Sequence, residues 1–526
     1  MTEPPKPSSA VPVSGWRLRV LVFVSGAVLM GLEMAASRVL ATHFGSSIYV
    51  WGAIISVFLA ALSVGYVLGG KLADARPSFF LLNTVVFAAG CWQLLIPFYA
   101  HPFCRALVQS NLGERMGPLL ATLVLFGGPS ILMGMASPFA VRLAARSMEK
   151  LGIVAGQLYA ISTFGSIAGT LLTAFWLIPD FGVRTVLLVL AAALAALPFV
   201  LLPGSRAIFL LAAPLAVIGP AAFILEPPET VPLRAGQRKL FETDSAYHHI
   251  LVTEDDAWDA RWLQFNNYIE SGVGLRPPWP TRTTYTDSFE LARVFRPDLK
   301  RILVIGGGGG IGPRKFTSDD PDVVVDLVEI DPVVVEVAKR WFHLVETERL
   351  RIHVEDGRRF VRRSRGPYDL VILDAYTIGG QIPFHLTTQE FMKDIQRVLA
   401  PGGVLLANIN SSLEGRKSRV LRSEAKTFES VFGGVHVFPR RMEFERGKLE
   451  PVDRLRTRNV MLIALNGNEP WDKAGVIRSA AAIVAAGRQP TPTFYDDAVE
   501  YLETPLPTHD VPLLTDDHAP VDTMAF

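Results

Sequence analysis

The stretch Arg301-Ile-Leu-Val-Ile305, followed by Gly306-Gly-Gly-Gly-Gly-Ile-Gly312, decides the fold of the C-terminal half of this chain. Its apolar run predicts a buried β-strand. The glycines that follow predict a sharp turn, where the backbone can approach a ligand without interference from Cβ atoms. A glycine-rich loop alone is weak evidence, so the interpretation depends on the strands that come after it.

Three more apolar runs follow at the spacing of a strand–helix repeat, and each ends in acidic residues. They are Val323–Val328 before Glu329-Ile330-Asp331, Leu350–Val354 before Glu355-Asp356-Gly357, and Tyr368–Leu373 before Asp374-Ala375-Tyr376. A helix is expected over Pro332–Trp341, with proline at its first turn. The alternation predicts a doubly wound, Rossmann-like parallel sheet, whose ligands bind outside the carboxyl ends of the strands.

The residues at these strand ends suit a nucleoside. Glu329, about 20 positions past the glycine loop, can accept hydrogen bonds from both ribose hydroxyls. Asp356 can bind an exocyclic amine such as the adenine N6. We expect Asp374 to be catalytic or to bind substrate, whereas Asp331 is expected only to cap the helix that follows it.

A small β-rich segment precedes this sheet. Tyr247–Thr253 and Arg261–Phe265 predict strands, and Glu254-Asp255-Asp256 predicts the turn between them. The expected organisation is a tail (1–19), a membrane domain (20–225), a linker (226–240), a β-rich subdomain (241–290) and a Rossmann-like domain (291–526).

The N-terminal half is strongly apolar. Half of the 526 residues are hydrophobic and only 19% are charged, and the apolar residues concentrate before about Leu225. Seven stretches are long enough to cross a hydrocarbon layer of about 30 Å. We therefore expect a polytopic helical bundle in a bilayer, with spans near Val20–Ala41, Ile48–Gly70, Phe79–Ala100, Pro118–Val141, Gln157–Ile178, Val183–Leu202 and Ala207–Leu225.

Sidedness remains open on the sequence. Basic residues cluster before the first span and after the second and fourth, which puts the N-terminus in the cytoplasm. Seven crossings would then carry the C-terminal domain outside, away from a cytosolic nucleoside cofactor. Because the cofactor argument is the stronger one, we expect this domain on the cytoplasmic side of the cell (inner) membrane. Either one stretch does not cross, or the proline-broken fourth segment hides an eighth crossing.

Other features narrow the function. Glycine pairs four residues apart, Gly65 with Gly69 and Gly165 with Gly169, suit close helix packing. Glu33 and Arg38 lie within the first span, where a charge is costly, and form either a polar site or a structural ion pair. The net charge of +1 and the absence of a dense basic stripe give no sign of nucleic-acid binding. The two cysteines have no metal-ligand spacing, and no metal is expected.

With these motifs, the chain resembles the spermidine synthase (polyamine aminopropyltransferase) family, in particular its membrane-fused members. The resemblance rests on Ser245–Ile250, Ile302–Gly308, Val328–Asp331, Glu355–Gly357, Tyr368–Asp374 and Leu399–Gly403, and on the tail segment Leu514–Pro520. It implies a co-substrate, decarboxylated S-adenosylmethionine or S-adenosylmethionine itself, and a small-molecule amine as acceptor. It is also compatible with a homodimer.

The resemblance implies a role for each candidate residue. Asp374 would deprotonate the attacking amine, Glu329 would hold the ribose and Asp356 the adenine. The remaining cofactor ligands would come from Gly306, Gly307, Gly308, Gly310 and Gly357, and the substrate would contact Tyr285, Asp287, Tyr376 and Thr377.

Two positions depart from the family pattern. Gly309 stands where the family has an aspartate that pairs with the aminopropyl amine, and Thr377 stands where a second aspartate grips the polyamine. Each loss of a charge-assisted hydrogen bond should cost about 1.5–3 kcal/mol. Besides aminopropyl transfer, two alternatives therefore stay open: an S-adenosylmethionine-dependent methyltransferase, and a transporter or sensor that binds a nucleoside or polyamine without turnover.

Overall fold

The computed structural model describes residues 15–45, 47–110, 112–145, 151–202, 233–266, 268–376, 382–442, 445, 452–467 and 469–524. Contacts within the chain divide it into two compact units, Met1–Pro232 and Leu233–Phe526. Each unit has its own hydrophobic core.

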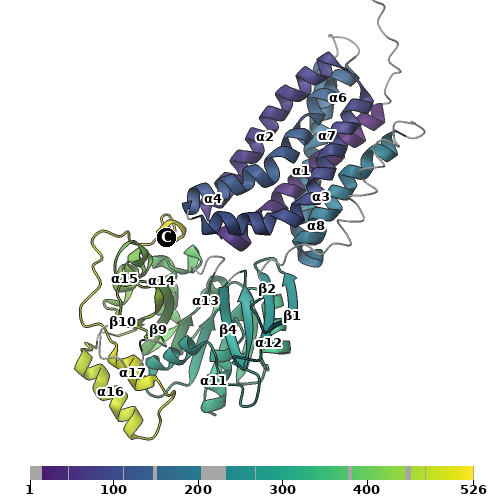
Figure 1. The fold of residues 1–526 in the computed structure, drawn as a ribbon. Coiled ribbons are helices and arrows are strands. Elements are labelled where there is room, and N and C mark those ends of the chain that lie inside the picture. The colour runs from purple at the N-terminus through teal and green to yellow at the C-terminus, as the bar shows by residue number, and fades with distance from the viewer. Residues whose placement is uncertain are drawn as a thin grey trace, which may run out of the picture. The chain divides into compact units, whose positions relative to one another are not determined.

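The first unit is a bundle of long apolar helices that lie side by side (Figure 1). Five segments are long and apolar enough to cross a membrane, judged by length and composition: Gly15–Phe44, Ile48–Ala75, Phe79–Gln109, Arg115–Ala144 and Leu151–Leu201. The helices are α1 (Gly15–Phe44), α2 (Ile48–Ala75), α3 (Phe79–Gln109), α4 (Gly113–Thr122), α5 (Gly128–Gly134), α6 (Ala136–Ala144), α7 (Leu151–Leu172) and α8 (Ile178–Leu201).

The fifth segment contains two of the predicted spans. Its 51 residues would reach about 75 Å as one straight helix, far more than a bilayer needs. Gly182 interrupts it with a non-helical backbone, φ 74° and ψ 162°. A Cβ placed on Gly31 of α1 would lie 2.8 Å from Thr173 Oγ1 and 3.0 Å from Leu190 Cδ1, so both flanks of Gly182 return to the same level of α1. The chain therefore reverses at Gly182, and the described residues supply helix for six passes.

The fourth segment is a single pass. Helices α4, α5 and α6 follow one another through a π-helical turn, Leu123–Gly127, and through Met135, whose backbone is also helical. The prediction of a hidden extra crossing in this segment is therefore wrong, because the prolines are accommodated within one helical run. The seventh predicted span, Ala207–Leu225, lies outside the described residues.

Close helix contacts are made at the glycines that the sequence singled out. A Cβ on Gly165 would lie 2.1 Å from Phe23 O, and one on Gly169 would lie 2.0 Å from Ala27 O, so α7 contacts the backbone of α1 directly. Gly65 and Gly69 bring α2 equally close to the backbone of α5 and Met135. The predicted role of these glycines in helix packing is confirmed.

The second unit begins with a four-stranded antiparallel sheet in the order β1-β2-β3-β4. Its strands are β1 (Gln237–Asp244), β2 (His249–Asp255), β3 (Ala260–Phe265) and β4 (Tyr268–Gly274). The predicted linker thus overlaps β1. The predicted turn at Glu254 and Asp255 is wrong, because both residues continue β2 and Glu254 pairs across the hairpin with Arg261 (3.0 Å).

The larger sheet has seven strands in the order β10-β11-β9-β8-β5-β6-β7, and its parallel core runs from β9 to β7. Three strands match the predicted runs at both ends: β5 (Arg301–Ile305), β7 (Leu350–Val354) and β8 (Tyr368–Leu373). The others are β6 (Val324–Glu329), β9 (Leu399–Ser411), β10 (His436–Pro439) and β11 (Arg458–Leu465). The doubly wound sheet is confirmed.

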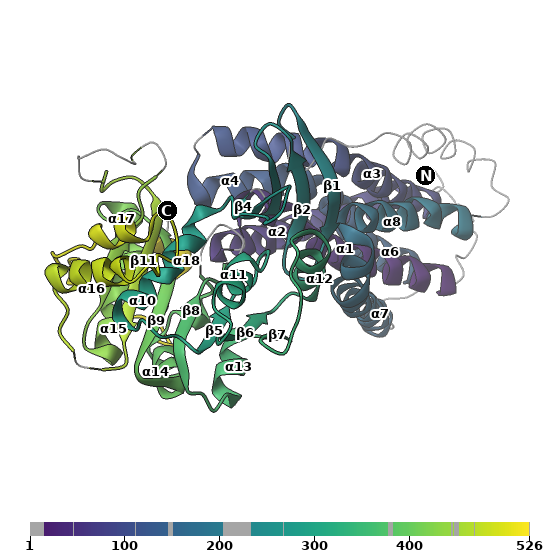
Figure 2. The same ribbon diagram turned by 90° about the horizontal axis from the view of Figure 1, so that it is seen from below.

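Helices cover both faces of this sheet (Figures 1 and 2). Buried side chains of α13 (Gly357–Arg363), α14 (Gln389–Val398) and α15 (Arg419–Phe432) form one core with the strands. The opposite face packs on α10 (Ala292–Phe295), α11 (Ile311–Asp319), α12 (Pro332–Trp341), α16 (Lys473–Ala485), α17 (Phe494–Val499) and the 3-10 helix η4 (Thr284–Leu291). The small sheet packs on α11 and α12 through its own apolar cluster.

Replacement of Gly169 by valine should separate α1 from α7, because the new side chain has no room beside Ala27 O. Overpacking of this kind costs about 1–3 kcal/mol. We expect the thermal midpoint of the full chain, purified in detergent, to fall. Gly156→Val is the matched control, since a Cβ at Gly156 of the same helix meets nothing within 4 Å. Equal effects of the two variants would contradict the packing described for Gly169.

Candidate functional site

Four strand ends meet at the carboxyl edge of the parallel sheet, as the sequence predicted. Gly306 donates its N–H to Val328 O (2.9 Å), and Asp374 donates its N–H to Ile305 O (2.9 Å). A Cβ on Gly306 would lie 2.3 Å from Asp374 O, and the φ of Gly306 is +100°. Only glycine fits this position, so the loop after β5 lies directly against the end of β8.

The end of β6 holds the carboxyl group of Glu329. Its two oxygens accept hydrogen bonds from the backbone N–H groups of Gly307 (2.8 Å) and Asp331 (3.0 Å). Burial raises the pKa of Glu329, and these backbone hydrogen bonds oppose the shift. Each carboxyl oxygen has two lone pairs, so the group can still accept from a ligand. Asp331 caps α12 through Val333 N (2.9 Å), as predicted.

The end of β7 leads into α13, which Asp356 caps. Its Oδ1 accepts from Arg359 N (2.9 Å), and its Oδ2 lies 3.0 Å from His385 Nε2. The next helical residue, Arg358, makes two 2.7 Å hydrogen bonds to the carboxylate of Asp516. The tail segment Leu514–Pro520 thereby fixes the start of α13. Asp356 already has two partners, and a ligand amine at this position would share its carboxylate with them.

Asp374, at the end of β8, is held by two side chains from other elements. Its Oδ1 accepts from Asn408 Nδ2 (2.8 Å) and its Oδ2 from the hydroxyl of Tyr285 (3.2 Å). Burial raises the pKa of Asp374 to about 7, although these two hydrogen bonds act in the opposite direction. Tyr376 donates its hydroxyl to Asn408 O (2.6 Å). A carboxyl group that titrates near neutral pH can exchange a proton with a substrate.

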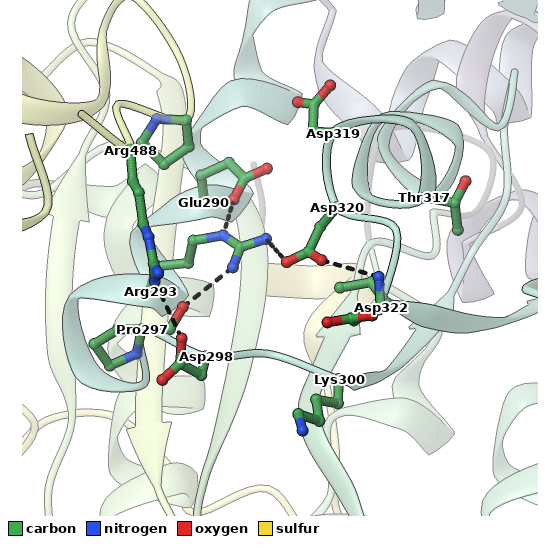
Figure 3. A network of polar contacts seen from close by, with 12 residues as sticks. Glu290, Arg293, Pro297, Asp298, Lys300, Thr317, Asp319, Asp320, Asp322 and Arg488 are labelled. Atoms are coloured by element: carbon green, nitrogen blue, oxygen red, sulfur yellow. Dashed lines mark hydrogen bonds and ion pairs between the residues drawn. The ribbon is translucent and has the colours of Figure 1, made fainter. Parts of the chain in front are cut away.

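Tyr285 reaches this carboxyl group from the 3-10 helix η4, which is tied down along its length. Ser288 donates to Asp497 Oδ2 on α17 (2.8 Å). Glu290 is buried and accepts a hydrogen bond from Arg293 Nε (2.7 Å). Both residues belong to the network of polar contacts drawn in Figure 3. In that network Arg293 also donates to Pro297 O (3.1 Å) in the loop before β5. These contacts position the helix that carries Tyr285.

The remaining predicted residues lie elsewhere. Asp287 is buried two positions beyond Tyr285, and with three residues per turn the two side chains leave the helix in different directions. Its role as a substrate ligand stays a prediction. Thr377 lies outside the described residues. Glu33 and Arg38 are partly buried on α1, in the helical unit.

Three polar residues near the site escaped the sequence interpretation. Asn408 sits in the middle of a strand that reads as an apolar run. Burial, and then the charges of Asp374 and Glu329, raise the pKa of Glu270 on β4 to about 8. Burial also raises the pKa of Glu424 on α15 to about 8, and neither oxygen of this carboxyl group has a hydrogen-bond partner among the described residues. The charge of Glu424 contributes to the raised pKa of Tyr376.

No group of three or more His, Cys, Asp or Glu side chains in the described part of the chain could hold a metal ion.

Comparisons with known proteins show which families this chain resembles. A family profile described as the spermine/spermidine synthase domain matches residues 289–437. A polyamine aminopropyltransferase of Vibrio vulnificus is 38% identical over 148 residues, which cover 28% of this chain and 48% of that protein. A polyamine aminopropyltransferase of Mycobacterium tuberculosis is 27% identical over 425 residues, which cover 75% of this chain and 78% of that protein.

A third relative is a methyltransferase. The eEF1A lysine and N-terminal methyltransferase of Bos taurus is 32% identical over 141 residues, which cover 25% of this chain and 20% of that protein. The chain thus spans about half of the Vibrio vulnificus protein and a fifth of the Bos taurus protein, but most of the Mycobacterium tuberculosis protein.

The raised pKa of Asp374 predicts a measurable effect on stability. The pKa rises from 3.8 to about 7 on folding, so the folded state prefers the protonated form. The contribution of Asp374 is therefore fully favourable below about pH 4 and is lost as the pH rises through about 7. We expect Asp374→Asn to raise the thermal midpoint at pH 8 by more than at pH 5. Asp517→Asn, an exposed carboxyl group, is the control. An identical shift at both pH values would contradict the assignment.

Proposed function

We propose that this chain, whose residues 289–437 match the spermine/spermidine synthase profile and which is similar to polyamine aminopropyltransferases, is a membrane-tethered aminopropyltransferase. It would transfer the aminopropyl group of decarboxylated S-adenosylmethionine to a small-molecule amine. The observation that carries the proposal is Asp374, a carboxyl group with a pKa of about 7 held by Tyr285 and Asn408 beside the glycine loop.

The donor would bind across the strand ends. Glu329 would accept hydrogen bonds from the ribose hydroxyls, and Asp356 from the adenine amine. The loop Gly306–Gly308 would line the nucleoside, because Gly306 already contacts the backbone of β8 and leaves no side chain in the way. These assignments follow the order of the strand ends along the sheet, with Glu329 one strand from the loop and Asp356 at the adjacent edge strand.

Asp374 would act as the general base. An ammonium group has no lone pair, so a carboxylate must remove a proton before the nitrogen can attack carbon. The nitrogen then forms a bond to the aminopropyl carbon attached to the sulfonium, and the C–S bond breaks. Its electron pair stays on sulfur, which neutralises the sulfonium and releases methylthioadenosine. Since the leaving group is already activated by its charge, alignment of the two reactants supplies most of the acceleration.

The acceptor side has features suited to a cationic amine. Tyr285 and Tyr376 both contact the Asp374–Asn408 pair. Glu424 adds a buried carboxyl group near Tyr376, as its effect on the tyrosine pKa indicates. An amine that enters beside Asp374 would therefore meet negative charge on more than one side.

The helical unit supports the membrane tether. The six helical passes of the described residues, an even number, would return the chain at Leu201 to the side of the N-terminus. Arg17 and Arg19 at the start of α1, Lys71 near the end of α2 and Arg142 in the last turn of α6 favour the cytoplasm for that side. We expect the catalytic unit to face the cytosol because its nucleoside donor is available there. Glu33 and Arg38 would form a polar site within the bundle.

Product identity tests the proposal. The full chain, incubated with labelled donor and an amine, should release methylthioadenosine, and the same assay with S-adenosylmethionine should release little S-adenosylhomocysteine. Asp374→Asn should lower turnover at least 100-fold, the lower range for general-base catalysis, while donor binding persists. Production of S-adenosylhomocysteine in preference to methylthioadenosine would establish methyl transfer instead. Binding without any product would favour a sensor.

A further inference from the structure

A cavity of about 490 Å³ lies in the second unit, at the edge of the large sheet opposite Asp374. Leu465, which lines it, ends β11 and pairs with Val404 near the start of β9. Asp374 follows the far end of β8, which runs parallel to β9. At about 3.3 Å per residue, these strands separate the two edges by roughly 15–20 Å. The cavity is therefore distinct from the site at the strand ends.

Four segments form the walls of this cavity: the end of α15, the turn into β10, the loop after β11 and the segment after α17. The last segment is held along β10, because Leu502 donates its N–H to Val437 O (2.9 Å). The hydroxyl of Tyr501 lies 3.2 Å from His436 Nδ1 and 3.4 Å from Trp471 O. This hydroxyl joins three of the four walls, so the cavity is formed before any ligand enters.

The walls carry negative charge without a basic partner. Glu429, Glu469 and Glu503 line the cavity, and none of its described lining residues is Lys or Arg. None of the three carboxylates forms an ion pair or a side-chain hydrogen bond with another described residue. Arg422 and Lys426 of α15 bind the C-terminal tail instead. The lining therefore attracts cations and repels anions.

Two more features of the lining favour a cation. Burial lowers the pKa of His436 to about 4, so this ring is uncharged at neutral pH. Helix α15 ends at the cavity, where Phe432 and Gly433 line it. The C-terminal end of a helix carries a partial negative charge from its free carbonyl groups.

The spacing of the carboxylates and the apolar surface between them narrow the kind of cation. No three carboxylates in the described part of the chain lie close enough to hold a metal ion. Aromatic and aliphatic side chains line the space around them, among them Trp471, Tyr501 and Leu506. Aromatic rings attract ammonium groups, and aliphatic side chains accept methylene groups. An extended cation with separated charges and an aliphatic chain fits both observations.

We propose that this cavity binds an aliphatic polyamine, with its ammonium groups on Glu429, Glu469 and Glu503 and its methylene groups against the apolar walls. Such binding goes beyond the proposed transfer reaction and does not require it. A polyamine bound at this edge of the sheet would leave the site at Asp374 open.

Hydrogen–deuterium exchange of the full chain in detergent, with spermidine as the probe, locates the binding site. We expect spermidine to slow exchange in residues 433–437 and 501–508, and Mg²⁺ at equal ionic strength to slow it there much less. Unchanged exchange in these segments, or equal protection by Mg²⁺, would overturn the polyamine site. Protection of peptides that contain Tyr285 and Asp374 is measured in the same experiment and bears only on the proposed function.

A pair of double variants tests the carboxylates. Glu469→Gln with Glu503→Gln removes two exposed charges, so the fold should be unaffected. The spermidine concentration for half-maximal protection of residues 501–508 should rise roughly 3- to 10-fold, as expected for two exposed ion pairs. Glu336→Gln with Glu348→Gln changes the net charge equally at exposed positions that do not line the cavity and should leave that concentration unchanged. Equal effects of the two double variants would contradict the proposal.

Discussion

Several carboxyl groups are brought together at the carboxyl edge of one sheet, and this concentration of negative charge is the constraint on which the rest of the site depends. Glu329, Asp374 and Glu270 approach one another where the strand ends meet the glycine loop. Burial raises the pKa of Asp374 to about 7, and burial together with the charges of Asp374 and Glu329 raises the pKa of Glu270 to about 8. Burial of like charges opposes folding, so a cationic ligand is the natural partner of this arrangement.

The surrounding fold can be understood as the support for that edge. Gly306 allows β5 and β8 to end against each other, and the 3-10 helix η4 holds Tyr285 over Asp374. The tail residue Asp516 fixes Arg358 at the start of α13, beside the carboxylate of Asp356. Most of these contacts join segments far apart in the sequence, which is why a separate domain of this size is needed to hold the site.

Local patterns predicted the parallel sheet well. Three of the core strands and the helix α12 begin and end where the apolar runs do, because buried strands and capped helices are encoded within a few residues. The predicted Glu329, Asp374 and glycine loop come together for the same reason, since each follows its strand directly. Glu270 and Asn408 could not be found in this way. Glu270 lies on β4 of the small sheet and Asn408 within the apolar run of β9, and neither position marks the end of a predicted core strand, so only the tertiary fold relates them to Asp374.

The helical unit shows which features of a membrane bundle hydropathy can predict and which it cannot. Hydropathy located its helices, and small-residue spacing identified the glycines at which they touch. Hydropathy could not show that the chain reverses at Gly182 or that the fourth segment is a single pass. Both features depend on the backbone angles of single residues, which the hydropathy of a segment does not reveal. The number of passes matters for function, since it decides on which side of a membrane the catalytic unit lies.

Proton release on donor binding tests the central claim most directly. A dicationic donor that binds among Glu270, Asp374 and Glu329 should stabilise their ionised forms and expel protons that the empty site holds near pH 7. Calorimetry of the full chain in buffers of different ionisation enthalpy measures the number of protons released when the ligand binds. We expect net proton release for decarboxylated S-adenosylmethionine and markedly less for methylthioadenosine. Equal values for the two ligands, or proton uptake with the donor, would contradict this expectation.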